Sequence, residues 1–355
     1  MTTTDLISMG IDPCYWYPAI RLKDLGRRPT RVRLWHQDVV LFRSRQGDIV
    51  AFEDRCRHRK VALSEGMVDD TGIVCPFHGW CYDTNGVLAR IPYWPDARPL
   101  PKLSLRRFPT TIGNGIVWIR QDDSTAQQDD PGFYARLQFP GDQWFHIIMD
   151  RTFPNHFAFG VINGMDFFHF HLHRRYQPWQ QIRLVARHDD ADSVTADYEI
   201  TMEGSLPARL FKRLLRNGRQ TRLVEQIHVE YVYPHHFASV GEDMKVTVFF
   251  RPIDERQTHV FIDMYFARPQ KFWVPRWLYL NIVQKLFFYR IQAEDAWAGE
   301  LEQRANETAP DVLRAEINPI SLAVEHLIET KWRRFDGTMA DADPGHIAKL
   351  PVSTD

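Results

Sequence analysis

The sequence predicts an α+β chain of two domains, with a β-rich domain over residues 1–123 and a larger mixed domain over residues 124–355. Three observations support this division. Short apolar runs separated by turn residues fill residues 30–120. A polar stretch rich in Asp and Gln, residues 122–131, follows as a linker. Beyond the linker, segments with a helical pattern alternate with segments of period two.

In the first domain, the clearest element is a hairpin. Val39–Phe42 and Ile49–Phe52 are apolar runs, and residues 45–48 between them, which include a glycine, suit a turn. Residues 82–86 form another turn signal, and Gly115–Ile119 has the composition of a buried strand that closes the domain. We therefore expect an all-β domain.

In the second domain, helices and an antiparallel sheet are expected together. Residues 155–173 have a helical pattern over much of their length, and residues 277–303 predict one or two helices. Residues 181–202 and 224–266 alternate apolar and polar side chains, which is typical of strands in a half-buried sheet. This order of elements predicts helices that cover one sheet.

The composition excludes several functional classes. A net charge of −1 gives no electrostatic basis for binding nucleic acid. The N-terminal residues lack a basic and an apolar region, and no apolar run reaches the ~18 residues of a transmembrane helix, so neither a secretory signal nor a membrane span is expected. The chain has 4 cysteines, a small number that favours the reducing cytoplasm.

Two short clusters of metal-ligand type dominate the first domain. Cys56 and His58 form one cluster, Cys75 and His78 form the other, and sixteen residues separate His58 from Cys75. This set suits a Rieske [2Fe–2S] centre, in which two Cys bind one iron and two His bind the other. A structural zinc site is the alternative, but zinc pairs usually place like ligands together, as in C-x₂₋₄-C and H-x₃₋₅-H. The mixed pairs favour the cluster.

The spacing C-x-H…C-x-x-H, with Pro76 and the run from His78 to Trp80, resembles that of the Rieske non-haem iron oxygenases, in their large (α) subunit. Respiratory Rieske proteins carry two further Cys that form a disulfide, and Val61 and Phe77 occupy those positions here. The resemblance therefore points to the ring-hydroxylating and demethylating oxygenases. It implies a Rieske domain followed by a helix-grip catalytic domain. Cys14 and Cys81 are interpreted as inert core thiols.

An oxygenase also needs a mononuclear Fe(II), which such enzymes hold with two His and one carboxylate. His169, His171 and His173 lie close together in the segment predicted as helix. On a helix, His169 and His173 share a face, whereas His171 points about 200° away from His169. We therefore choose His169 and His173 as iron ligands. The family pattern, N-x-x-D-x-x-H, usually has four residues before the second His; three occur here, so His171 stays as a reserve ligand.

The resemblance supplies the remaining site residues. Asp295 lies in a stretch like the late acidic helix of the family, whose Asp completes the iron site, and Glu294 is the adjacent alternative. Asp166 stands three residues before His169. In the family, such an Asp bridges an iron-ligating His and a cluster His of a neighbouring subunit. This role requires a homo-oligomer, and we expect a homotrimer.

These assignments predict a terminal oxygenase that uses O₂ to hydroxylate or oxidatively demethylate an apolar or aromatic organic substrate. Gly113 and Gly115 lead into a strand rather than a helix, so no dinucleotide site is expected, and the resemblance implies a separate NAD(P)H-dependent reductase of flavin or ferredoxin type. The alternative is an electron-transfer protein with a degenerate catalytic domain. Residues 205–223 form a basic amphipathic segment that suits an acidic electron donor, a membrane surface or packing on its own domain.

Overall fold

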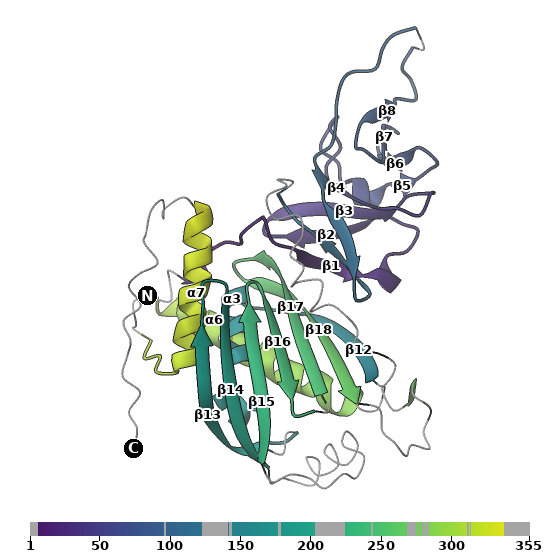
Figure 1. The fold of residues 1–355 in the computed structure, drawn as a ribbon. Coiled ribbons are helices and arrows are strands. Elements are labelled where there is room, and N and C mark those ends of the chain that lie inside the picture. Colours follow the sequence, from purple (N-terminus) through teal and green to yellow (C-terminus); the bar gives the residue numbers. More distant parts are fainter. Residues whose placement is uncertain are drawn as a thin grey trace.

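The structure is a computed structural model of the chain. Its described residues are 6–95, 97–122, 141, 144–176, 179–202, 224–242, 244–267, 275, 277–278, 281, 284–310, 312 and 314–336. The described strands form four antiparallel sheets of three, four, four and seven strands. In Figure 1 the two four-stranded sheets lie above the seven-stranded sheet. The predicted basic segment 205–223 and most of the predicted linker lie outside the described residues, so the division at residue 123 stays a prediction.

The strands before residue 120 form the three smaller sheets. One sheet has the order β2-β3-β4-β9, a second β5-β6-β7-β8, and the third β1-β11-β10. The hairpin expected between residues 39 and 52 is confirmed, because Val39 pairs with Glu53 across β3 and β4. The expected closing strand is β11, and all four of its residues are buried. The bounds are β1 (Tyr17–Arg21), β2 (Thr30–Leu34), β3 (Gln37–Arg43), β4 (Ile49–Glu53), β5 (Met67–Val68), β6 (Gly72–Val74), β7 (Cys81–Asp83), β8 (Leu88–Arg90), β9 (Arg107–Phe108), β10 (Thr110–Gly113) and β11 (Ile116–Ile119).

The strands after residue 143 form one seven-stranded sheet with the order β12-β18-β17-β16-β15-β14-β13. Helices α3 and α6 lie behind this sheet in Figure 1, and α7 stands at its left-hand edge, where it packs against α3 and β14. Strand β15 follows period two: its alternate residues Ile227, Val229 and Tyr231 are buried. The α+β fold class is therefore confirmed. The bounds are β12 (Trp144–Phe153), α3 (Phe157–Met165), β13 (Trp179–Asp189), β14 (Ser193–Met202), β15 (Val224–Val232), β16 (His235–Val240), β17 (Met244–Asp254), β18 (Gln257–Ala267), α6 (Tyr289–Thr308) and α7 (Pro319–Asp336).

Two glycines one turn apart bring helix α3 close to the strands. A Cβ atom on Gly160 would lie 3.2 Å from the Phe250 ring of β17, and one on Gly164 would lie 3.7 Å from the His236 ring of β16. Residues four apart share a helix face, so both glycines face the sheet. The close approach sets the distance between α3 and the sheet. It therefore also sets the position of the chain at the end of α3, where the segment with the histidines begins.

The helix predicted over residues 155–173 is shorter than expected. Helix α3 ends at Met165, and a 3₁₀ helix over Phe167–His171 follows it. Asp166 lies between them in extended conformation, and its Oδ1 accepts a hydrogen bond of 2.9 Å from the backbone N–H of Phe168. A short acidic side chain that caps a new turn in this way competes with the continuing α-helix.

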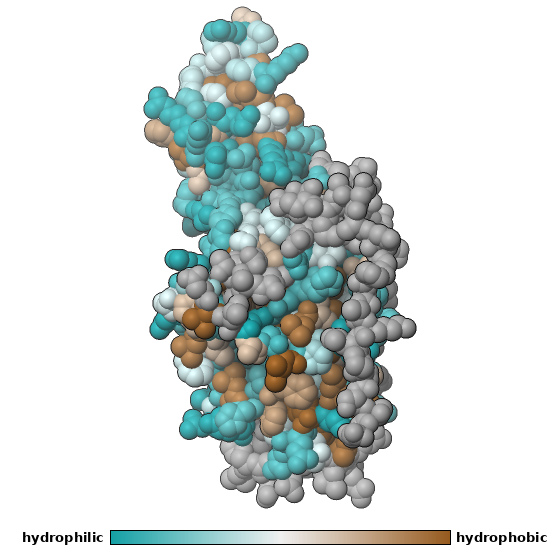
Figure 2. Space-filling model, turned by 90° about the vertical axis from the view of Figure 1, so that its left-hand side faces the viewer, coloured by the Kyte–Doolittle hydropathy of each residue, from teal (hydrophilic) through white to brown (hydrophobic). Residues whose placement is uncertain are grey.

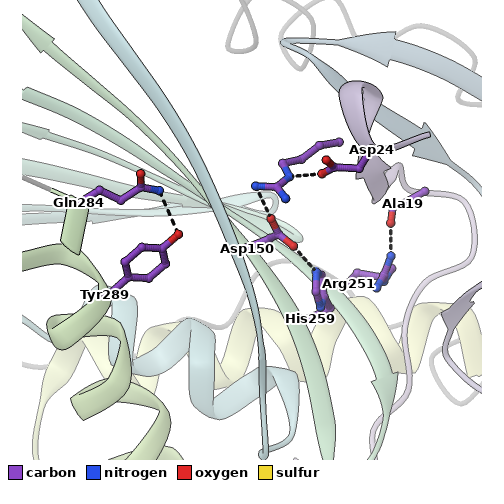
Figure 3. Close-up of polar contacts among 8 residues, drawn as sticks. Ala19, Asp24, Asp150, Arg251, His259, Gln284 and Tyr289 are labelled. Carbon is purple, nitrogen blue, oxygen red and sulfur yellow. Dashed lines mark hydrogen bonds and ion pairs between the residues drawn. The ribbon is translucent and has the colours of Figure 1, made fainter. Parts of the chain in front are cut away.

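Polar contacts join β1 to the face of the large sheet opposite its helices (Figure 3). Arg21 lies 2.9 Å from Asp150 of β12, and His259 of β18 lies 3.2 Å from the same carboxylate. The buried guanidinium of Arg251 donates to the carbonyl of Ala19. Burial lowers the pKa of Arg251 to about 10, so the group still carries its charge at neutral pH. These contacts attach the N-terminal part to the seven-stranded sheet.

The surface of the chain is not uniform. Figure 2 shows a mainly hydrophilic upper part, whereas hydrophobic residues gather over the part that contains the seven-stranded sheet. Trp297 and Leu301 of α6 are among the exposed large hydrophobic residues. Within the described part of the chain, no helix has the length and apolar character needed to cross a membrane.

Candidate active site and metal centres

Two loops of matching backbone carry the predicted cluster ligands. In the first, the Cys56 N–H donates to the Val61 carbonyl at 2.9 Å, and the Lys60 N–H donates back to the Cys56 carbonyl at 2.8 Å. The second loop repeats both bonds. The Cys75 N–H donates to the Trp80 carbonyl at 2.8 Å, and the Gly79 N–H donates back to the Cys75 carbonyl at 3.1 Å. Lys60 and Gly79 hold the same place in the two loops, with φ of 59° and 68°. The paired loops present one Cys and one His each.

The loop side chains converge. Cys56 and Cys75 are 1% and 3% exposed, and the ring centroids of His58 and His78 are 4.5 Å apart. Trp80 stacks on His58 at 4.7 Å between centroids. The Nδ1 atom of His58 is buried and has no hydrogen-bond partner among the described residues. A buried nitrogen without a partner beside two buried thiols fits a ligand of an iron–sulfur cluster.

Tyr82 is a further residue of this centre, which the sequence analysis did not identify. Its hydroxyl accepts the backbone N–H of Arg57 at 3.0 Å and lies 3.4 Å from the Cys56 sulfur. A cysteine that binds iron does so as a thiolate without a proton, so in the cluster-bound protein the Tyr82 hydroxyl would donate to the Cys56 sulfur. Hydrogen bonds to cluster sulfurs are one of the factors that set the reduction potential. The signal in the sequence is weak, because a tyrosine in a short strand also suits ordinary core packing.

The second group of possible metal ligands includes the histidines that follow the C-terminal end of α3. One ligand atom from each of His169, His173 and Asp295 lies within 4.8 Å of the others. The Nε2 atom of His173 is 3.0 Å from Asp295 Oδ1, and that of His169 is 3.7 Å from the same oxygen. Two imidazoles and one carboxylate that meet at one point match the ligand set of mononuclear Fe(II) oxygenases. The residues present therefore fit such an iron.

A second set of contacts orients these three side chains. The Nδ1 atom of His169 contacts the backbone carbonyl of Asp166, and that of His173 lies 2.9 Å from Glu294 Oε2. Asn163 of α3 donates from Nδ2 to Asp295 Oδ1 at 3.1 Å. With Nδ1 held on both rings, each Nε2 faces the common point, which is the usual arrangement around a metal-binding His. Glu294, considered above as an alternative ligand, lies on the far side of the His173 ring.

The charges of the side chains in the site couple metal binding to the protonation of His173. Burial lowers the pKa of His173, but hydrogen bonds to Asp295 and Glu294 and their charges raise it above its ordinary value. Burial raises the pKa of Asp295, yet the bond from His173 and the charges of both histidines bring it below its ordinary value. Without a metal, the site thus favours an imidazolium paired with a carboxylate. A cation that binds here releases the proton of His173.

The structure brings His169 and His173 together for a reason other than the one expected. They do not share the face of one α-helix, because His169 lies in the 3₁₀ helix and His173 in the turn after it. The two ring centroids are 5.1 Å apart. His171, the reserve candidate, is exposed, and its carbonyl accepts from Arg174. The choice of ligands itself stays a prediction.

Comparison with known proteins identifies the family. Residues 15–108 match the family described as the Rieske [2Fe-2S] domain. The chain is 33% identical over 349 residues to the 4beta-methylsterol monooxygenase of Methylococcus capsulatus, and the alignment covers 95% of this chain and 93% of that protein. This chain belongs to the Rieske non-haem iron oxygenases. Identity of this extent along nearly the whole length argues against the alternative of an electron carrier with a degenerate catalytic domain.

Solved structures agree in fold with this Rieske oxygenase. Dicamba monooxygenase bound to dicamba superposes with a TM-score of 0.75 at 19% identity, over 93% of this chain and 100% of that one. The terminal oxygenase of carbazole 1,9a-dioxygenase from Nocardioides aromaticivorans superposes with a TM-score of 0.64 at 18% identity, over 92% of this chain and 95% of that one. The cofactors follow from the match to the Rieske [2Fe-2S] domain and from membership of the oxygenase family: they are the [2Fe–2S] cluster and the mononuclear iron predicted from the sequence, and the zinc alternative is wrong.

The geometry predicts different iron contents for two histidine variants. His173→Ala removes an imidazole whose Nε2 faces Asp295, so the purified protein should lose its mononuclear iron and keep its cluster absorbance. His171→Ala changes an exposed ring outside the group and should keep about three irons per chain, two in the cluster and one mononuclear. Metal analysis with visible spectroscopy measures both. Loss of iron in His171→Ala alone would make the ligand assignment wrong.

Glu294→Gln tests the orienting contact. The amide keeps the size of the side chain but loses the charge beside His173 Nδ1, so Fe(II) affinity should fall about 10- to 100-fold. Glu300→Gln is the matched control, because this carboxylate lies on the same helix and pairs with Arg304 at the surface. Anaerobic titration with Fe(II) measures both affinities. Equal affinities in the two variants would show that Glu294 does not support the site.

Proposed function

We propose that this chain is the terminal oxygenase of a system that oxidises a methyl group on a large, apolar, polycyclic substrate of the sterol class. The observation that carries the proposal is the match along 95% of the chain to a protein named for its action on a 4β-methylsterol. Apolar side chains also gather where α6 begins, seven residues before Asp295. Phe288, the residue directly before α6, packs among aromatic and aliphatic side chains: Phe145, Ile147, Met149, Met264 and Phe266.

Within this function, each predicted residue takes a role. Cys56 and Cys75 would hold one cluster iron, and His58 and His78 the other. His169, His173 and Asp295 would hold Fe(II) and leave coordination positions open. When bound, the cluster supplies single electrons, and the mononuclear iron supplies the activation of O₂.

The side chains around the triad provide orientation rather than further chemistry. Glu294 and the Asp166 carbonyl fix both imidazole rings, and Asn163 fixes the Asp295 carboxylate. His173 is 2% exposed in its side chain, so water is largely excluded from that ligand. A site held from three separate elements keeps its geometry when the substrate binds. An apolar pocket beside the triad would place the substrate by shape, which suits a molecule that is almost entirely hydrocarbon.

We propose that the protein works as a homotrimer in which Asp166 of one subunit lies beside the cluster of the next. Figure 1 places β5–β8, which flank the second cluster loop, at the far end of the upper part, away from α3. One chain by itself therefore keeps its two centres apart. Charges support the pairing of neighbours: Arg57, Arg59 and Lys60 are exposed on the first loop, while Glu302 and Glu316 lie near Asp166.

Asp166→Asn should slow electron transfer between subunits while both metal sites stay loaded. An amide oxygen can still accept from Phe168 N–H, so the local turn survives, but the charge that would bind a cluster imidazole is lost. Single-turnover reoxidation of the reduced cluster, with substrate and O₂, measures the rate. Asp190→Asn is the control, because that carboxylate also caps a local turn, at Ser193. A wild-type rate in Asp166→Asn, or a monomeric enzyme that turns over, would rule out the bridge.

The electrons would come from a separate reductase with a flavin or ferredoxin domain, in the cytoplasm. One relative, from Comamonas testosteroni and 39% identical over 116 residues, is named as the iron-sulfur subunit of a monooxygenase system, which supports a multi-component arrangement. The basic loop around Cys56 would also suit an acidic donor.

The substrate class is tested with the reconstituted system. The purified oxygenase, supplied with a heterologous reductase and NADH, should convert a 4-methylsterol into a product that contains one more oxygen atom, as detected by mass spectrometry. A methylxanthine is the comparison substrate, because a demethylase for that class is 32% identical over only 41% of this chain. Turnover of the methylxanthine without turnover of the sterol would contradict the proposed class.

A further inference from the structure

A stripe of buried residues begins at Phe288, directly before helix α6, and continues along the helix to Gln303. Its residues recur at intervals of four, four, three and four positions, which keeps them on one side of an α-helix. The buried stripe consists of Phe288, Gln292, Ala296, Gly299 and Gln303. Two of the five are glutamines, which are mostly exposed in proteins. Each buried amide must therefore be accounted for by a partner.

Gln303 has its partners within the fold. Its Oε1 accepts the backbone N–H of His156 at 2.9 Å, and its Nε2 donates to Glu307 at 2.9 Å. Gln292 differs. It is 3% exposed, and neither its amide nitrogen nor its amide oxygen has a hydrogen-bond partner among the residues that the structure describes. An unpartnered buried amide is costly, so a group that binds there is the usual explanation.

Along the chain, Gln292 lies between Phe288 of the apolar cluster and Asp295 of the triad. It stands three residues before Asp295, so the two side chains are neighbours on the helix surface. It also follows Phe288 by one turn, and Phe288 packs into the aromatic and aliphatic cluster on β12 and β18. The two ring nitrogens of His236 also have no hydrogen-bond partner within the described chain. This ring, however, lies against Gly164, between α3 and the strands, and not on α6.

We propose that Gln292 is a specificity-determining residue that hydrogen-bonds the single hydroxyl or keto oxygen of an otherwise apolar substrate. The substrate class rests on the proposed function. A primary amide both donates and accepts, so it suits an alcohol or a ketone equally. A sterol is by definition such a molecule, with one hydroxyl on a hydrocarbon ring system. Fixing that oxygen near Asp295 determines which carbon faces the iron site.

This role predicts discrimination against substrates without the oxygen. A deoxy analogue fills the same apolar space but leaves the amide unpartnered, and sites built to bind a polar group reject such analogues. One neutral hydrogen bond corresponds to about tenfold in affinity. The wild-type enzyme should therefore bind the hydroxylated compound about tenfold more tightly than its deoxy counterpart.

The binding test compares two probes and two proteins. The probes are a 4-methylsterol with a free 3-hydroxyl and the same sterol without it; the proteins are the wild type and Gln292→Leu, both iron-loaded and free of O₂. Tryptophan fluorescence follows binding. In Gln292→Leu the preference for the hydroxyl should disappear, because affinity for the hydroxylated sterol falls while that for the deoxy sterol is kept. A preference that persists in Gln292→Leu overturns the proposal.

Thermal unfolding without substrate provides an independent test. Gln292→Leu should unfold at the same or a higher temperature, because leucine removes an unpartnered amide, whereas Gln303→Leu should unfold at a lower temperature. A drop in Gln292→Leu equal to that in Gln303→Leu would show a structural role and overturn the proposal. If the wild type binds neither sterol, the sterol class proposed above is wrong. The unfolding comparison still decides whether the Gln292 amide is free.

Discussion

The contact between Asn163 and Asp295 is the interaction on which the catalytic site depends. It joins two helices whose residues are 132 positions apart in the chain. Helix α3 leads directly into the segment with the two histidines, and α6 carries the carboxylate. If α3 and α6 were displaced relative to each other, His169 and His173 would no longer face Asp295. Gly160 and Gly164 allow α3 to lie close to β16 and β17, and this position of α3 brings Asn163 within reach of Asp295.

Asp166 adds a second constraint, because it ends α3 at the point where the site begins. Its carboxylate caps the 3₁₀ helix, and its carbonyl holds the His169 ring. The same residue thus directs the chain and orients a ligand. Burial raises the pKa of the Asp166 carboxyl, although the Phe168 N–H opposes this shift. The pKa of a carboxyl group that is partly buried, close to both an imidazole and other acids, is sensitive to the arrival of a cation.

The N-terminal part is attached to the large sheet through charged groups as well as apolar packing. Asp150 interacts with both Arg21 and His259. The hydrogen bond from His259, together with the charge of Arg21, holds the pKa of the Asp150 carboxyl below its ordinary value. Asn114, in the turn between β10 and β11, contacts the buried Asp263. Buried charged and polar groups need specific partners, so these contacts select one relative position of the two parts. That position also sets where the cluster loops lie relative to the triad of the same chain.

The sequence by itself determined the α+β class, the hairpin at Val39–Phe52 and the cluster loops, because each depends on residues close together in the chain. Short motifs such as Cys56–His58 and Cys75–His78 require ligand spacing that is visible without coordinates. Tertiary structure alone decided the rest. The end of α3 at Asp166, the place of Glu294 behind His173 and the unpartnered amide of Gln292 depend on which distant segments meet. Periodicity reports the face that a residue occupies, whereas only packing between α3, α6 and the sheet reports what lies opposite that face.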